Sequence, residues 1–179
     1  MKKIIPYCIS LFLIFSCSTT VKKNIPDSQK IKQIKNTYWK SEKVEEKRSF
    51  NEGQYEFETK INGESCASCI EKAEIGKIVL GYLSDSGDKE GVAVIYSETG
   101  GSGTFVYLNL YLEKNGKMEQ SGYPVFLGDR VKVKKFSILD KKVVVNLITH
   151  GKGEPLCCPT TKEVWEFKVL NGQLKKIKK

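Results

Sequence analysis

The chain has only one histidine, five prolines and no apolar run of about 18 residues, the length that a membrane-spanning helix requires. The lone His150 excludes a metal site built from several histidines. A Gly-x-Ser-x-Gly nucleophile elbow is absent, and so is any internal repeat. Hydrophobic residues make up 40% of the 179 residues and charged residues 28%, which is typical of one globular domain and excludes a disordered or collagen-like chain.

The formal net charge of +9 raises the question of nucleic-acid binding. Stretches near the two ends hold 11 of the 30 basic residues and one of the 21 acidic residues, whereas segment 36–173 is nearly neutral. The basic residues of these stretches are Lys2, Lys3, Lys22, Lys23, Lys30, Lys32, Lys35, Lys175, Lys176, Lys178 and Lys179. Nucleic-acid affinity needs clustered basic residues on an ordered surface. We therefore expect no nucleic-acid binding and interpret the basic tails as segments beside an anionic bilayer.

The N-terminus has the organisation of a bacterial lipoprotein signal peptide. Met1-Lys2-Lys3 is a positive n-region, and Ile4 to Phe15 is an apolar stretch too short to span a bilayer. Ile14-Phe15-Ser16-Cys17 resembles a lipobox, although an aromatic residue such as Phe15 is unusual two positions before the cysteine. We predict a signal peptide over 1–16, lipidation of Cys17, and export to a bacterial membrane with the domain at the periplasmic face or cell surface. An ordinary signal peptide with an incidental cysteine and an uncleaved anchor are the alternatives.

The next segment, 17–35, is predicted to be the lipidated N-terminus and a flexible tether. It is rich in Ser, Thr, Lys and Asn and has almost no apolar surface to offset the entropy of ordering. Within it, Ile31 and Ile34 are spaced for one face of a short helix around Ser28 to Lys35. Attachment through two or more acyl chains on Cys17 would be lasting, because each buried methylene adds roughly 0.8 kcal/mol.

Segment 36–179 reads as a single β-rich domain that ends in a short basic tail. Alternating apolar residues predict half-buried strands, as at Tyr55 to Ile61, while Val92 to Tyr96 and Phe105 to Leu112 are apolar on both faces and predict interior strands covered from two sides. The fold class is mainly β with minor α+β character. We expect an antiparallel meander or sandwich of roughly eight to ten short strands and few short helices, the second of them near Ile70 to Ile75.

Turn signals divide this domain into hairpins. Asn62-Gly63, Asn115-Gly116 and Asn171-Gly172 predict type I′ turns, and a polar turn is expected at Asp140-Lys141-Lys142. The apolar alternation changes register around Lys134-Lys135, which predicts a β-bulge.

Four cysteines remain after Cys8 leaves with the signal peptide and Cys17 is lipidated: Cys66 and Cys69 in a CxxC unit, and the adjacent Cys157 and Cys158. Disulfides are the default state of exported cysteines. Adjacent cysteines have Cα atoms about 3.8 Å apart, below the usual 5.5 to 6 Å, which favours two long-range bridges between the clusters. One local bridge in each cluster, a four-sulfur metal site, and redox chemistry at the CxxC unit stay open as alternatives.

Three weaker signals have simpler explanations. Thr99 to Thr104 is glycine-rich but lacks the Gly-Lys-Ser/Thr ending of a phosphate loop, which favours a strand connection. Ser84 to Glu90, with Asp85 and Asp88, resembles a calcium loop, but Lys89 stands where an oxygen ligand should fall, which favours a solvated turn. A nucleophilic pair of Cys157 and His150 is disfavoured by oxidation of the thiol. We expect no metal and no other cofactor.

Three segments together resemble a group of uncharacterised exported bacterial proteins. They are Thr99-Gly100-Gly101-Ser102-Gly103-Thr104-Phe105, Phe126-Leu127-Gly128-Asp129-Arg130-Val131 and His150-Gly151-Lys152-Gly153-Glu154-Pro155-Leu156-Cys157-Cys158-Pro159-Thr160. The Cys-Cys-Pro-Thr segment and the strand after it are also similar to the LppP/LprE lipoprotein family. Members of the first group often carry an Asp-rich stretch before the first segment, which this chain lacks. The resemblance spans roughly Asn36 to Leu174 and implies an exported or lipid-anchored domain without an established activity, cofactor or catalytic residues.

The sequence therefore predicts a lipid-anchored cell-envelope lipoprotein with a binding or structural role and no catalysis. The membrane is its expected partner, through the N-terminal lipid, and no protein or ligand partner is predicted. The alternative is a thiol-disulfide or metal-handling envelope protein that uses Cys66, Cys69, Cys157 and Cys158.

Overall fold

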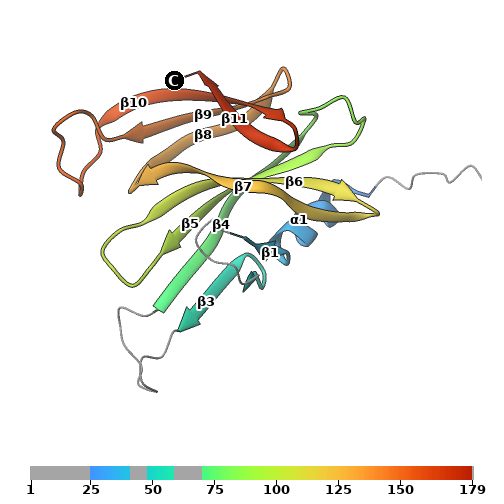
Figure 1. Cartoon of the computed structure of the whole chain (residues 1–179), viewed down its shortest axis with the longest axis horizontal. Helices are drawn as coiled ribbons and strands as arrows, with labels where there is room; N and C mark the ends of the chain where they lie inside the picture. Colours follow the sequence, from blue (N-terminus) through green and yellow to red (C-terminus); the bar gives the residue numbers. More distant parts are fainter. Residues whose placement is uncertain (1–24, 41–47, 59–69, 179) are drawn as a thin grey trace, which may run out of the picture.

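The computed structural model describes residues 25–40, 48–58 and 70–178. In chain order the elements are α1 (Asp27–Lys35), β1 (Tyr38–Trp39), β2 (Arg48–Ser49), β3 (Gln54–Glu58), β4 (Ile70–Gly81), β5 (Glu90–Glu98), β6 (Phe105–Lys114), β7 (Lys117–Asp129), β8 (Lys132–Leu139), β9 (Lys142–Thr149), β10 (Thr161–Leu170) and β11 (Gln173–Lys178). The predicted mainly β class is confirmed. Antiparallel meanders form a five-stranded sheet, β3-β4-β5-β6-β7, and a four-stranded sheet, β11-β10-β9-β8, while β1 pairs with β2 (Figure 1).

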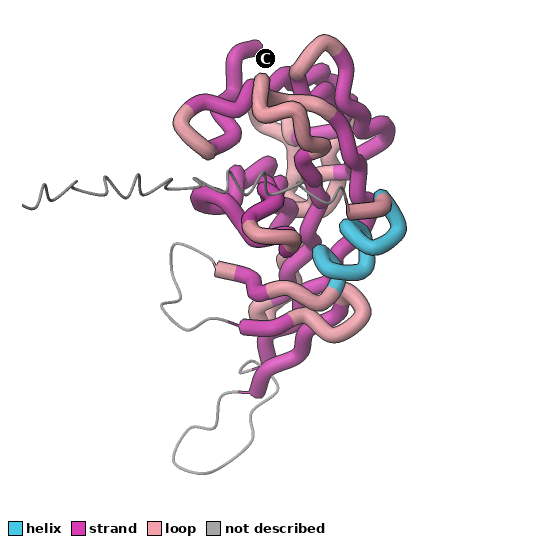
Figure 2. Tube along the Cα trace, turned by 90° about the vertical axis from the view of Figure 1, so that its right-hand side faces the viewer, coloured by secondary structure: helices cyan, strands magenta, loops and turns pink. Residues whose placement is uncertain are grey.

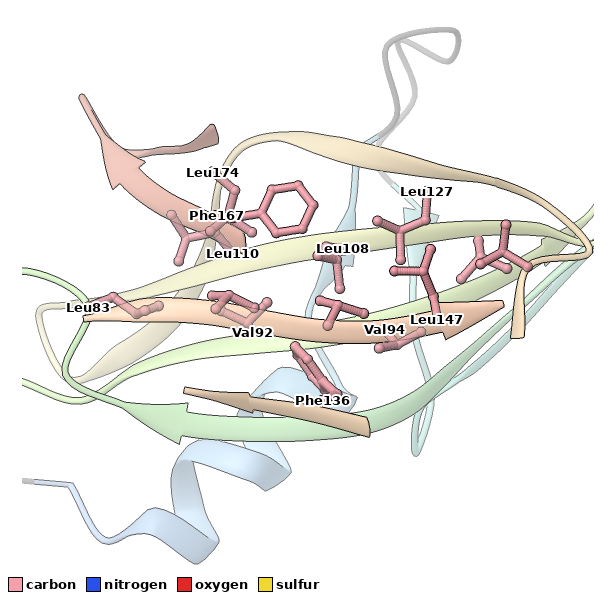
Figure 3. Close-up of a cluster of buried hydrophobic side chains, with 14 residues drawn as sticks. Leu83, Val92, Val94, Leu108, Leu110, Leu127, Phe136, Leu147, Phe167 and Leu174 are labelled. Atoms are coloured by element: carbon pink, nitrogen blue, oxygen red, sulfur yellow. The ribbon is translucent and has the colours of Figure 1, made fainter. Parts of the chain in front are cut away.

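The two large sheets pack face to face as a sandwich, because each presents every second side chain to the other. β5 contributes Val92 and Val94 to the inner core, and the four-stranded sheet contributes Phe136, Val145 and Phe167. All five side chains are buried. Figure 3 shows this cluster between the strands. The inner core therefore joins residues that lie far apart in the sequence.

The outer face of the five-stranded sheet carries a second core, which α1 covers (Figure 2). Ile34 of the helix is fully buried against Ala93 and Tyr111 of the sheet and against Trp39. A Cβ atom on Gly91 would lie 2.5 Å from Ile34 Cδ1, so only glycine leaves room for the helix there. β5 and β6 are thus covered from both sides, as the sequence predicts.

The short helix predicted at Ser28 to Lys35 is confirmed, but the prediction of a flexible tether as far as residue 35 was wrong for 27–35. The segment is ordered because two of its side chains, one isoleucine and one lysine, are buried against the sheet. Ile34 enters the outer core, and Lys30 is 2% exposed, with its Nζ 2.6 Å from Glu113 Oε2 and 3.1 Å from the Lys89 carbonyl oxygen. The ordered domain therefore includes α1.

The predicted turns and bulge lie where the sequence places them, within the described residues. Asn115-Gly116 and Asn171-Gly172 have positive φ at both positions and join β6 to β7 and β10 to β11. Asp140-Lys141 does the same between β8 and β9. The register of β8 shifts between Val133 and Lys135, which confirms the bulge. The Asn62-Gly63 turn lies outside the described residues.

Two further expectations were wrong. Ile70 to Ile75 is not a helix but the start of β4, because Ala73 and Ile75 alternate with polar residues and enter the outer core, a period of two. The basic residues Lys175 and Lys176 are not in a tail, because they lie in β11, the short strand that the sequence also predicts near Leu174 and Ile177; Leu174 is buried in the inner core and Lys175 pairs with Lys168, while Lys179 lies outside the described residues. Their charge is therefore on an ordered surface.

Candidate functional site

The three segments that carry the family resemblance converge at one end of the sandwich. The loop 99–104 joins β5 to β6, the turn at Asp129–Val131 joins β7 to β8, and the loop 150–160 joins β9 to β10. Ser97 pairs with Phe105 and Phe105 with Asp129, while Thr149 pairs with Thr161, so all three connections leave their sheets at the same end. We call this end of the molecule the motif end; two of its loops project to the left in Figure 1.

Arg130 connects the three segments through its guanidinium group. Nη2 donates to the carbonyl oxygen of Ser102 at 2.6 Å and to its hydroxyl at 3.1 Å. Nη1 donates to the carbonyl oxygen of Leu156 at 3.2 Å and lies 2.6 Å from Asp129 Oδ2. The planar guanidinium fork is suited to several acceptors in fixed directions, which a lysine ammonium is not. One side chain thus holds loops from both sheets.

The backbone of the turn sets the direction of this side chain. Arg130 has φ 52°, and its amide donates to the Thr104 carbonyl oxygen at 2.7 Å. The Thr104 amide in turn donates to Asp129 Oδ1 at 3.0 Å. Gly128 precedes this turn with φ 139°, and a Cβ there would lie 2.6 Å from Val131 Cγ2. The Leu-Gly-Asp-Arg order therefore has a structural reason at three of its four positions.

Glu154 organises the longest loop of the motif end. Its carboxylate accepts hydrogen bonds from the amides of Gly151 at 2.9 Å and Thr160 at 3.0 Å, and from the hydroxyls of Thr160 and Thr161. These donors, the Thr160 hydroxyl first, lower the pKa of Glu154 to about 2. The carboxylate therefore stays ionised at neutral and mildly acidic pH and acts as a fixed acceptor in the loop.

His150 and the adjacent cysteines lie in the same loop. His150 Nε2 is 2.9 Å from the Leu156 carbonyl oxygen, which also accepts from Arg130. Cys157 and Cys158 are exposed and form a disulfide with each other, with Cα atoms 3.8 Å apart. At this cluster the structure has a local bridge, as in the alternative with one bridge in each cluster, instead of the long-range bridges that the sequence favoured. Because its sulfur is in the disulfide, Cys157 forms no nucleophilic pair with the histidine.

The remaining cysteines of the prediction, Cys17, Cys66 and Cys69, lie outside the described residues. No group of three or more His, Cys, Asp or Glu side chains within 25–40, 48–58 and 70–178 has the arrangement of a metal site. The described part also has no helix that is both long and apolar enough to cross a bilayer.

In the loop that resembles a calcium site, the carboxylates of Glu90 and Asp85 accept hydrogen bonds from other groups of the protein. Glu90 is buried and accepts from the Leu83 amide at 2.8 Å and from the hydroxyls of Ser84 and Ser86. Asp85 pairs with Lys141, which donates a hydrogen bond and lowers the pKa of Asp85. The loop is thus held by serine hydroxyls and a lysine, in agreement with the predicted turn.

Arg130 lies in one of the three segments that carry the resemblance, but the sequence pattern does not mark it as a functional residue. One feature of the sequence does point to Arg130: only two of the 30 basic residues are arginines, and this one follows an aspartate in a turn.

No protein family, curated protein or solved structure matches the chain.

Proposed function

We propose that the protein is an exported lipoprotein, anchored through lipid on Cys17, that works in the cell envelope as a non-catalytic binding domain with the motif end as its binding surface. The positive n-region, the short apolar stretch and the lipobox-like Ile14-Phe15-Ser16-Cys17 support export and anchoring. Binding surfaces are commonly formed by loops that a rigid sheet scaffold positions.

One observation carries the binding role: Arg130 joins three connections that are distant in sequence into one ordered surface. Its partners Ser102 and Leu156 lie 28 and 26 residues away. Single-residue contacts of this kind cost conformational entropy in every loop that they order. Loops that served only to connect strands would not need such ordering.

Replacement of Cys17 tests the anchor. We expect cells that express the wild type to incorporate a palmitate analogue into the protein, and Cys17→Ala to incorporate none, because the thiol is the only proposed acceptor. Cys8→Ala is the matched control, since it removes a cysteine from the apolar stretch of the leader and should leave the label unchanged. Label that persists in Cys17→Ala, or an unlabelled wild type, contradicts the anchor.

The exposed disulfide between Cys157 and Cys158 favours a second candidate function, thiol-disulfide exchange. Titration of free thiols in the folded protein separates the two candidates. A binding domain should show no free thiol and keep its stability under mild reductant. A thiol-active protein should release two thiols readily at this pair, as located by alkylation and peptide mapping.

A further inference from the structure

The two sheets of the sandwich carry opposite charge. The strands of the five-stranded sheet contain nine acidic and four basic residues, whereas those of the four-stranded sheet contain two acidic and nine basic residues. The acidic side includes a hollow of about 500 Å³ on β3, β4 and β5, with Glu56, Glu74 and Glu98 in its wall. The neutrality of segment 36–173 is therefore a sum over two oppositely charged sheets and not an even mixture.

Six of the nine basic residues of the four-stranded sheet lie on one surface, the side that faces away from the inner core. Strand register assigns six lysines to this side, which we call the basic face: Lys132, Lys135, Lys142, Lys162, Lys168 and Lys175. One carboxylate shares their side in the register, Glu166, and it pairs with Lys142 at 3.0 Å. The described residues thus place a dense positive patch on an ordered sheet.

Aliphatic side chains lie between these lysines. Val164 is 46% exposed and Leu170 is 51% exposed, and both alternate with lysines along β10. Half-buried Val144 and Ile148 face the same side from β9. In contrast to the outer face of the five-stranded sheet, no helix or strand of the described residues covers this side.

We propose that the basic face is a docking surface for an anionic lipid bilayer. Lysines attract anionic headgroups, and exposed aliphatic groups beside them gain by entering the interfacial region. The combination is less suited to nucleic acid, because the face has no arginine and offers valine and leucine where phosphate contacts would need donors. The inference goes beyond the proposed function, because it needs neither lipid on Cys17 nor a ligand at the motif end.

Co-sedimentation of the full chain with vesicles tests the proposal. Vesicles of phosphatidylglycerol and phosphatidylcholine measure total binding, and vesicles of phosphatidylcholine alone measure the part that is independent of lipid charge, including that of the apolar N-terminus. We expect the wild type to bind the anionic vesicles more strongly and to lose the difference as salt is raised.

A charge-matched pair of variants locates the effect. Lys135→Gln/Lys168→Gln/Lys175→Gln removes three exposed lysines from the basic face. Its control, Lys77→Gln/Lys114→Gln/Lys117→Gln, removes three exposed lysines from the five-stranded sheet. Each lysine near an anionic surface contributes roughly a fivefold factor, so the basic-face variant should lose about 100-fold in the anionic component, whereas the control should lose less than about threefold.

Three results would overturn the proposal. Equal losses in the two variants would show that only net charge matters. Wild-type binding to double-stranded DNA without binding to anionic vesicles would assign the face to nucleic acid. Self-association that the basic-face variant abolishes, with vesicle binding unchanged, would assign it to a second copy of the chain. Palmitate labelling is read separately, so failure here is distinguishable from failure of the lipid anchor.

Discussion

Lys30→Met should destabilise the folded protein by about 3 to 5 kcal/mol in urea unfolding, because it leaves the carboxylate of Glu113 buried without its counter-charge. The two side chains are 3% and 4% exposed and their charged atoms are 2.6 Å apart. The variant also removes the hydrogen bond to the Lys89 carbonyl oxygen. The loss should appear as a lower urea midpoint with an unchanged slope.

Two further variants show whether the effect comes from the buried pair. Lys30→Met/Glu113→Leu should recover most of the lost stability, since replacing both charges of a buried pair with apolar groups is often neutral. Lys32→Met, on the exposed side of the same helix, should change stability by less than about 0.5 kcal/mol. If Lys30→Met lowered the free energy of unfolding by less than about 1 kcal/mol, α1 would not be part of the ordered domain but part of a flexible tether over 17–35.

The strands and turns were predictable because their signals are local. Side-chain alternation marks strands that are buried on one side, and Asn-Gly pairs supply the positive φ angles of two-residue hairpins. Continuous apolar runs such as Phe105 to Leu112 indicate cover on both sides without showing what supplies it. Here the two covers are different, a second sheet on one side and α1 on the other.

The wrong predictions concern segments whose structure depends on distant partners. Helix α1 has few apolar residues, and its order comes from the room that Gly91 leaves for Ile34 and from the pairing of Lys30 with Glu113. The start of β4 is too short a pattern to separate strand from helix until it pairs with β3 and β5. Neither effect is visible in a window of neighbouring residues.

The motif end and the basic face were missed for a similar reason. The sum over 36–173 conceals a charge separation between the two sheets, because it adds the acidic strands β3 to β7 to the basic strands β8 to β11, which follow them along the chain. The three motif segments were each noticed, yet their junction depends on which strand ends meet in the sandwich. Arg130 has its partners in two loops of the fold, and no spacing rule relates them.

Arg130→Ala should destabilise the protein by about 2 to 3 kcal/mol and release the loop 150–160. The reason is that charge-assisted hydrogen bonds contribute about 1.5 to 3 kcal/mol and the partly buried Asp129 would lose its cation. Trypsin should cut after the exposed Lys152 at least about tenfold faster than in the wild type, since loop opening sets the rate.

Lys141→Ala is a matched control for this experiment. Lys141 also has positive φ and also pairs with an aspartate, but that pair is exposed, with side chains 56% and 92% accessible. An exposed ion pair contributes at most about 1 kcal/mol, so the control should alter stability little and leave cleavage after Lys152 unchanged. Equal behaviour of the two variants would mean that the three loops hold their positions without the guanidinium group. The motif end would then be a set of independent connections, and the binding role that rests on their junction would lose its support.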